Sequence, residues 1–146
     1  MPSAFAAPNP EFAARVAESF RAQRFMQTLG ATLERVEPGA VDIGLPYREV
    51  LTQQHGYLHA GVVTAIADSA CGYAAHTLMP SGSEVLSVEF KTNLLRPAQG
   101  VRFLAEGRVV RAGGTLTVSR ADVWGFDDSG RERTLVATML ATLIRR

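Results

Sequence analysis

A single carboxylate, Asp68, lies at the centre of an apolar, small-residue segment that spans residues 51–75. The side chains around it are mostly Val, Ile, Ala and Gly. An ionised side chain is rarely buried without a partner, because removing its charge from water costs more than apolar contacts return. We therefore expect Asp68 to face a water-containing cleft, where a carboxylate can act as a general base or as a nucleophile.

A histidine, His59, precedes Asp68 by nine residues in the same segment. Nine residues of helix correspond to a rise of about 13.5 Å and about two and a half turns, so the two side chains point to nearly opposite sides. One chain therefore does not bring them together as a catalytic dyad. If both serve one site, that site is assembled from two subunits, and a homodimer is part of the chemistry.

Other kinds of site receive less support from the sequence. His55 and His59 have the i, i+4 spacing of metal ligands on a helix, but Gly56 lies between them and indicates a loop. Cys71 lies one turn from Asp68, whose charge disfavours a thiolate, so we expect a small core residue. Neither a GxxxxGK nor a GxGxxG motif occurs. We predict no metal site and no cofactor.

The spacing of apolar residues predicts the elements that position this segment. From Phe12 to Leu29 the spacing is roughly helical, which predicts one packed amphipathic helix, and residues 59–78 form a second, central helix. Two short strands are expected at residues 31–36 and 40–46. Alternation and glycine-containing turns predict later strands near residues 87–94, 101–110, 115–126 and 135–144.

The order of these elements indicates the class of fold. A helix and two short strands are followed by one buried helix and then a meander of strands. This order predicts an α+β fold in which an antiparallel sheet wraps a single helix, and it argues against a doubly wound α/β fold. We expect one domain over residues 1–146, with a loose N-terminal segment at about residues 1–9.

Composition limits the classes of partner and the compartment. The formal net charge is +1 and the isoelectric point about 8.0, so no strong field favours nucleic acid or anionic lipid. Cys71 is the only cysteine, which excludes an internal disulfide and a cysteine-rich metal site. The chain shows neither a leader pattern nor an apolar run of membrane-spanning length. We expect a soluble, cytoplasmic protein.

Three short motifs occur in an order that is typical of one family. The run His59-Ala60-Gly61 is followed by Asp68, the segment Ser-Val-Glu-Phe begins at residue 87 and leads to Arg-Pro-Ala at residues 96–98, and Arg-Ala-Gly-Gly-Thr-Leu spans residues 111–116. Over roughly residues 30–144 the chain resembles the hotdog-fold thioesterases, specifically the PaaI-like acyl-CoA thioesterases of the phenylacetate pathway. The resemblance implies a hotdog fold and hydrolysis of an acyl-CoA thioester.

The resemblance also implies roles for individual residues. Asp68 matches the carboxylate that acts as general base or nucleophile at the thioester carbonyl. His59, Ala60 and Gly61 open the central helix, whose free N–H groups would hold the developing oxyanion. Two further positions match residues of the site: Ser87 matches a strand serine that positions water, and Gln53 falls where the family more often carries Asn.

Substrate and partner follow from the same resemblance. Arg96, Arg111 and Gly113 lie where the family binds coenzyme A, and a tunnel between subunits would hold the acyl group among Val, Leu, Phe and Met side chains. A homodimer, or a dimer of dimers, is implied, and no cofactor is needed.

Two residues depart from the family pattern, and the sequence leaves two alternative functions open. Ala60 stands where the family has its first motif glycine, and Gln53 is longer than Asn by one methylene. The same fold also hosts hydratases and dehydratases of acyl thioesters. The second alternative is a non-catalytic acyl-CoA-binding protein.

Overall fold

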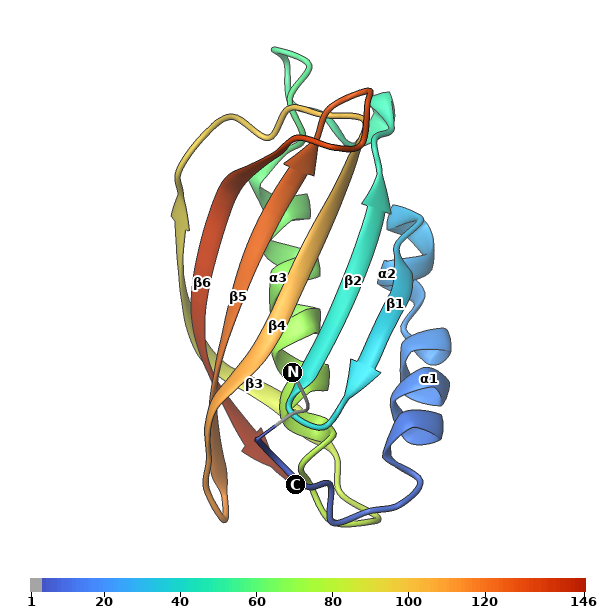
Figure 1. Ribbon diagram of the computed structural model, residues 1–146, viewed down its shortest axis with the longest axis vertical. Coiled ribbons are helices and arrows are strands. Elements are labelled where there is room, and N and C mark those ends of the chain that lie inside the picture. The colour runs from blue at the N-terminus through green and yellow to red at the C-terminus, as the bar shows by residue number, and fades with distance from the viewer. Residues whose placement is uncertain (1–3) are drawn as a thin grey trace.

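The computed structural model describes residues 4–146, in which six antiparallel strands form one sheet that curves around a central helix (Figure 1). The strand order is β1-β2-β4-β5-β6-β3. The helices are α1 (Phe12–Ala22), α2 (Arg24–Leu29) and α3 (Ala60–His76), with a short 3-10 turn at Glu49–Leu51. The strands are β1 (Thr32–Glu37), β2 (Ala40–Pro46), β3 (Val85–Leu94), β4 (Arg102–Ala112), β5 (Leu116–Phe126) and β6 (Arg133–Arg145).

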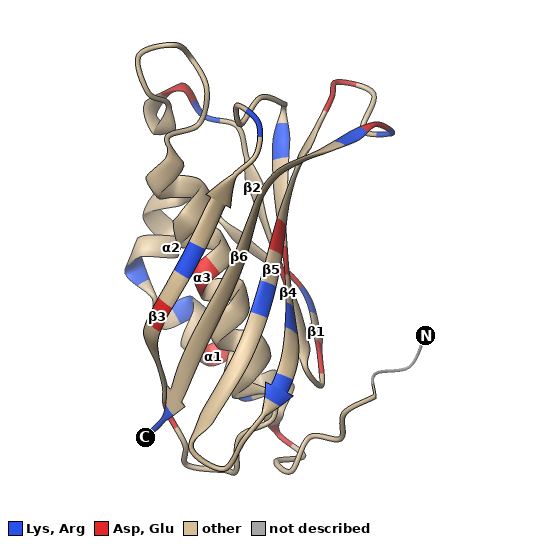
Figure 2. Ribbon diagram, turned by 90° about the vertical axis from the view of Figure 1, so that its left-hand side faces the viewer, with Lys and Arg blue, Asp and Glu red and all other residues tan. Residues whose placement is uncertain are grey.

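This arrangement confirms the predicted hotdog fold. The three helices lie on one side of the sheet (Figure 2). The apolar face of the central helix is buried throughout, and one of its members, Tyr73, packs edge-on against Phe20 of α1. The members of this face are Val62, Val63, Ile66, Ala70 and Tyr73. None of the helices in residues 4–146 is long and apolar enough to cross a membrane.

The sheet approaches the helix closely at Gly107 of β4. A Cβ atom added there would overlap the backbone carbonyl of Ala70 in α3. At Gly72 of α3, by contrast, an added Cβ meets no atom within 4 Å in the described chain. The small residues that let the sheet close on the helix are therefore Gly107 and Ala70, while Gly72 faces open space.

The predicted N-terminal helix is interrupted. The chain leaves helical geometry at Gln23, which has φ −78° and ψ 95°, so α1 ends at Ala22 and α2 begins at Arg24. The break changes which side chains of the second half face the core: Met26 and Leu29 are buried, whereas Phe25 is 55% exposed. The expected loose segment falls partly outside the described residues, at positions 1–3. Within the rest of it, Asn9 is buried.

Strand β3 is one edge of the sheet. It pairs with β6 on one side, and its other side has no strand partner among residues 4–146. Side chains on this edge are unusually exposed for apolar residues, with Phe90 44% and Leu94 57% accessible. An exposed, apolar strand edge is a template for pairing with another chain.

Candidate active site

A β-bulge in β3 aims Ser87 at Asp68. The register of the ladder with β6 shifts between Ser87 and Glu89, so Val88 is an extra residue. The bulge puts Ser87 on the helix-facing side of the strand together with Phe90, whereas strict alternation predicts opposite sides. Ser87 Oγ donates a hydrogen bond of 2.6 Å to Asp68 Oδ1. The two residues assigned to water activation are thus in direct contact.

Asp68 and Ser87 line a cleft of about 320 Å³ between α1, α3 and the start of β3. Asp68 is only partly buried, as expected for a carboxylate at a solvent-containing site. Among residues 4–146, Oδ1 receives the Ser87 hydrogen bond and no hydrogen bond to Oδ2 is recorded. Oδ2 is therefore positioned to accept one from water. The cleft lining is Ser19, Gln23, Asp68, Ser69, Gly72, Tyr73, Glu84, Val85, Leu86 and Ser87.

The start of α3 is capped by its own histidine. His59 is the N-cap residue, and its Nδ1 accepts a hydrogen bond of 2.8 Å from the N–H of Gly61. The next N–H, that of Val62, donates to the His59 carbonyl at 2.9 Å. No partner is recorded in the described chain for the N–H of Ala60, which leaves it as the donor at this helix end for an oxyanion.

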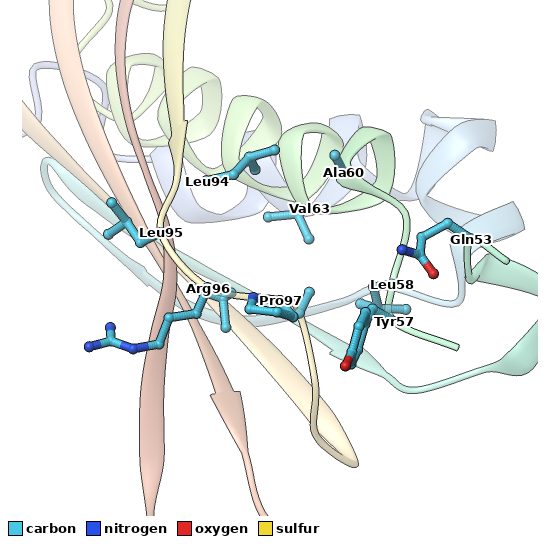
Figure 3. A pocket seen from close by; sticks show the side chains of 11 residues that line it. Gln53, Tyr57, Leu58, Ala60, Val63, Leu94, Leu95, Arg96 and Pro97 are labelled. Atoms are coloured by element: carbon cyan, nitrogen blue, oxygen red, sulfur yellow. The ribbon is translucent and has the colours of Figure 1, made fainter. Parts of the chain in front are cut away.

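A second cavity, of about 470 Å³, opens beside this helix start (Figure 3). Its lining is mostly apolar and includes Ala60 and Val63 of α3, Leu94 at the end of β3, and Gln53. Gln53 Oε1 accepts a 2.6 Å hydrogen bond from the N–H of His55, which fixes the side chain. Its Nε2 donors have no recorded partner within residues 4–146, so the amide can donate into the cavity.

The two cavities are separate within one chain. Asp68 and Ala60 lie eight residues apart in α3, which corresponds to about 12 Å along the helix axis. Asp68 with Ser87 therefore forms one group, and Gln53, His59, Ala60 and Gly61 form another. The structure does not bring the two groups together in a single chain.

The three residues assigned to coenzyme A also fall into separate places. Arg96 follows β3, donates from Nη1 to the Leu135 carbonyl at 3.2 Å, and extends its guanidinium away from the apolar cavity (Figure 3). Arg111 and Gly113 lie at the opposite end of β4, where the Gly113 N–H donates to the Leu116 carbonyl at 2.9 Å in the hairpin to β5. A strand of 11 residues is more than about 30 Å long. One chain therefore does not offer all three to a single phosphate group.

Cys71 is a core residue, as the sequence predicted. It is fully buried in α3. Burial, together with the nearby charge of Asp68, raises the pKa of its thiol to about 12. The thiol is therefore protonated and unreactive near neutral pH. No cluster of three or more potential metal ligands occurs in the part of the chain that the structure describes.

Sequence reasoning missed the polar wall of the cleft. Ser19 and Gln23 come from the N-terminal helical region, and Tyr73 is a buried residue of α3. The available signal was the i, i+4 spacing of Arg15, Ser19 and Gln23, which on a continuous helix would place three polar side chains along one line. In the structure, Arg15 and Ser19 lie on α1 and Gln23 lies at the break that follows it.

The chain is similar to known thioesterases. The family model described as the thioesterase superfamily matches residues 55–130, which include the helix start, Asp68 and Ser87. A thioesterase family protein from Silicibacter pomeroyi has a crystal structure with 49% sequence identity and a TM-score of 0.89, covering 92% of this chain and 97% of that one.

Two other proteins are more distant. A medium/long-chain acyl-CoA thioesterase of Escherichia coli K12, YigI, is 24% identical over 133 residues, 81% of this chain and 83% of its own. The PaaI protein from the phenylacetic acid degradation operon of E. coli, at 17% identity, shares the fold with a TM-score of 0.79, covering 93% of this chain and 94% of its own. These likenesses confirm the predicted PaaI-like resemblance and support thioester hydrolysis as the class of reaction. The chain belongs to the thioesterase superfamily.

Proposed function

We propose that this protein hydrolyses an acyl-CoA thioester to a free carboxylic acid and coenzyme A. The observation that carries the proposal is the Ser87–Asp68 hydrogen bond of 2.6 Å inside a cleft. A carboxylate held by one oxygen, with the other turned to solvent, suits activation of water. Membership of the thioesterase superfamily and similarity to an acyl-CoA thioesterase support the choice of substrate.

In the proposed reaction, Asp68 takes a proton from water while the water oxygen attacks the thioester carbonyl carbon. The carbonyl oxygen becomes an oxyanion held by the Ala60 N–H. Collapse of this intermediate breaks the carbon–sulfur bond, and the proton passes from Asp68 to the departing thiolate. In the nucleophilic variant, Asp68 attacks the carbonyl carbon and expels the thiolate, which forms a mixed anhydride. Water that attacks the Asp68 carbonyl of this anhydride releases the free acid and leaves a solvent oxygen in the Asp68 carboxylate.

The proposal includes a second copy of the chain. If β3 pairs with β3 of another copy in antiparallel fashion about its own midpoint, residue 85 of one strand lies opposite residue 94 of the other. Ser87 of one copy then faces the Leu94 end of its partner, beside the partner's apolar cavity and helix start. This pairing covers the exposed β3 edge and joins the two half-sites, so we propose a homodimer with two shared sites.

The same pairing gives the remaining assigned residues a common location. Antiparallel strands bring the Arg96 end of one copy level with the Arg111 and Gly113 end of the other. We propose that coenzyme A extends along this boundary, with its phosphates near these residues. Gln53 of the copy that supplies the helix start would hold the thioester oxygen or the attacking water through its Nε2 donors, and His59 would keep that helix end in place.

The proposal is tested by thiol release from short, medium, long and aromatic acyl-CoAs. Wild type is compared with Asp68→Asn, which keeps the shape but removes the base. Asp128→Asn, in an exposed loop, controls for loss of one negative charge. We expect wild type and Asp128→Asn to release thiol and Asp68→Asn to lose at least about a hundredfold in rate. Binding without release, or a change in enoyl absorbance without release, would contradict hydrolysis.

A further inference from the structure

The cleft that holds Asp68 has a polar far wall. Helix α1 buries Val16 and Phe20 against the core. Arg15 and Ser19 of the same helix, and Gln23 at the break between α1 and α2, are polar. Ser19 and Gln23 line the cleft opposite α3. The resemblance implied an acyl tunnel lined by apolar Val, Leu, Phe and Met side chains, whereas this wall is polar.

The wall is a connected hydrogen-bond network centred on Gln23. Ser69 Oγ donates to Gln23 Oε1 at 3.1 Å, and Gln23 Nε2 donates to the Tyr73 hydroxyl at 3.4 Å. Ser19 Oγ and the same hydroxyl lie 3.3 Å apart as hydrogen-bond partners. An amide NH₂ has two donors and a hydroxyl has two acceptor sites, so these groups hold capacity for a further partner.

Two features fix the Tyr73 hydroxyl as a neutral group at a set position. Its ring packs edge-on against Phe20, with ring centroids 6.1 Å apart at 61°. Burial raises the pKa of the phenol, with the Glu84 charge acting in the same direction and the Ser19 hydrogen bond opposing both. The hydroxyl is therefore protonated and can both donate and accept hydrogen bonds.

An ion pair lies at the end of the cleft. Glu84 lines the cleft just before β3, and its carboxylate forms an ion pair of 2.8 Å with Arg15 of α1. Asp68 and Tyr73 are five residues apart in α3, a rise of about 7.5 Å. A long alkyl chain entering from Asp68 would thus pass the polar wall and meet an ion pair, and both contacts would leave polar groups facing hydrocarbon.

We propose that this cleft receives the acyl group of the substrate, and that it selects compact acyl groups with a neutral hydrogen-bonding group at their far end, such as a hydroxyl or an amide. The inference rests on the proposed thioesterase function. Gln23 and Tyr73 are the specificity-determining residues, because their polar atoms lie at the far wall and Asp68 lies at the near end.

The test compares hexanoyl-CoA with ω-hydroxyhexanoyl-CoA, which are alike except for the terminal hydroxyl. For wild type, we expect kcat/KM to favour the hydroxylated substrate by at least about tenfold, because its hydroxyl can form a hydrogen bond with the polar wall and the alkyl end of hexanoyl-CoA cannot. Gln23→Leu removes the amide, and Tyr73→Phe removes only the hydroxyl while keeping the ring against Phe20. Each variant should bring the ratio of the two kcat/KM values down to about threefold or less.

Gln27→Leu is the matched control, since Gln27 is exposed on α2, bonds to the Arg21 carbonyl and does not line the cleft. It should keep the wild-type ratio. A wild-type ratio near or below one, or a ratio unchanged in both Gln23→Leu and Tyr73→Phe, would overturn this inference while thiol release itself still stands. Absence of thiol release by wild type from every acyl-CoA tested would instead remove the proposed function, and this inference with it.

Discussion

Removing the Ser87 hydroxyl tests how the strand bulge serves the carboxylate. In Ser87→Ala, Asp68 Oδ1 loses its 2.6 Å hydrogen bond while the backbone of the bulge stays unchanged. A hydrogen bond to a charged group contributes about 1.5–3 kcal/mol. If that energy orients the carboxylate in the transition state, kcat/KM falls roughly 10- to 150-fold. Stability should change little, within about 0.5 kcal/mol, because Ser87 lies on an exposed edge strand.

The structure offers a matched control on the same pair of strands. Thr142 Oγ1 of β6 donates 2.6 Å to Glu89 Oε1 of β3, on the outer face of the sheet. Thr142→Ala therefore removes the same kind of hydroxyl–carboxylate bond away from the cleft. Ser87→Thr retains a hydroxyl at the position of interest.

The assay is steady-state thiol release for all three variants, with denaturant unfolding to measure stability. We expect only Ser87→Ala to show the large loss in kcat/KM, with Ser87→Thr recovering part of the activity. Equal activities of Ser87→Ala and Thr142→Ala would refute the assigned orientation of Asp68 by Ser87.

Two further predictions concern the helix core. Gly107→Ala should lower the free energy of unfolding by about 1–3 kcal/mol, because its methyl would overlap the Ala70 carbonyl. Gly114→Ala is the control and should leave the free energy of unfolding unchanged, since no atom lies within 4 Å of the added Cβ. Equal denaturation midpoints for the two variants would contradict the close packing at Gly107. Cys71 has its thiol pKa raised from 9.0 to about 12 by burial and by the Asp68 charge. Above pH 9.0 the unfolded thiol ionises and the folded one does not, so the unfolded state binds fewer protons and stability falls as pH rises from 9.0 to about 12. Cys71→Ala should show a shallower decline in unfolding experiments over this range; identical slopes would disprove this contribution.

Periodicity was sufficient for the fold and for the faces of the central helix. The apolar side chains at 3.6-residue spacing in α3 are buried, and strand β2 begins at Ala40 and ends at Pro46, as predicted. The interruption at Gln23 was not predictable, because glutamine favours helix and nothing in its local sequence breaks one. Tertiary packing of α1 and α2 decides that position.

The site was predictable in its residues and less so in its geometry. The resemblance pointed to Asp68 and Ser87 together, but simple alternation would have turned Ser87 away from the helix. A bulge adds one residue without a distinctive sequence signal, and only the strand register reveals it. Similarly, the sequence could not show that Arg96 and Arg111 lie at opposite ends of the sheet, because that separation depends on strand pairing.

The central claim, that Asp68 of one chain works with the helix start of another, is tested most directly by complementation between two inactive variants. Asp68→Asn lacks the base. Ala60→Pro lacks the helix-end N–H, and proline fits this first helical position because His59 has φ −59° and ψ 138°, a conformation allowed before proline. Each variant alone should form a folded, inactive homodimer.

When the two chains are co-expressed in equal amounts, half of the dimers are mixed, and each mixed dimer has one site with both defects and one site with none. The account predicts recovery of about one quarter of the wild-type rate of thiol release. Recovery of no activity from a preparation shown by native mass spectrometry to contain mixed dimers would contradict a site shared between two chains.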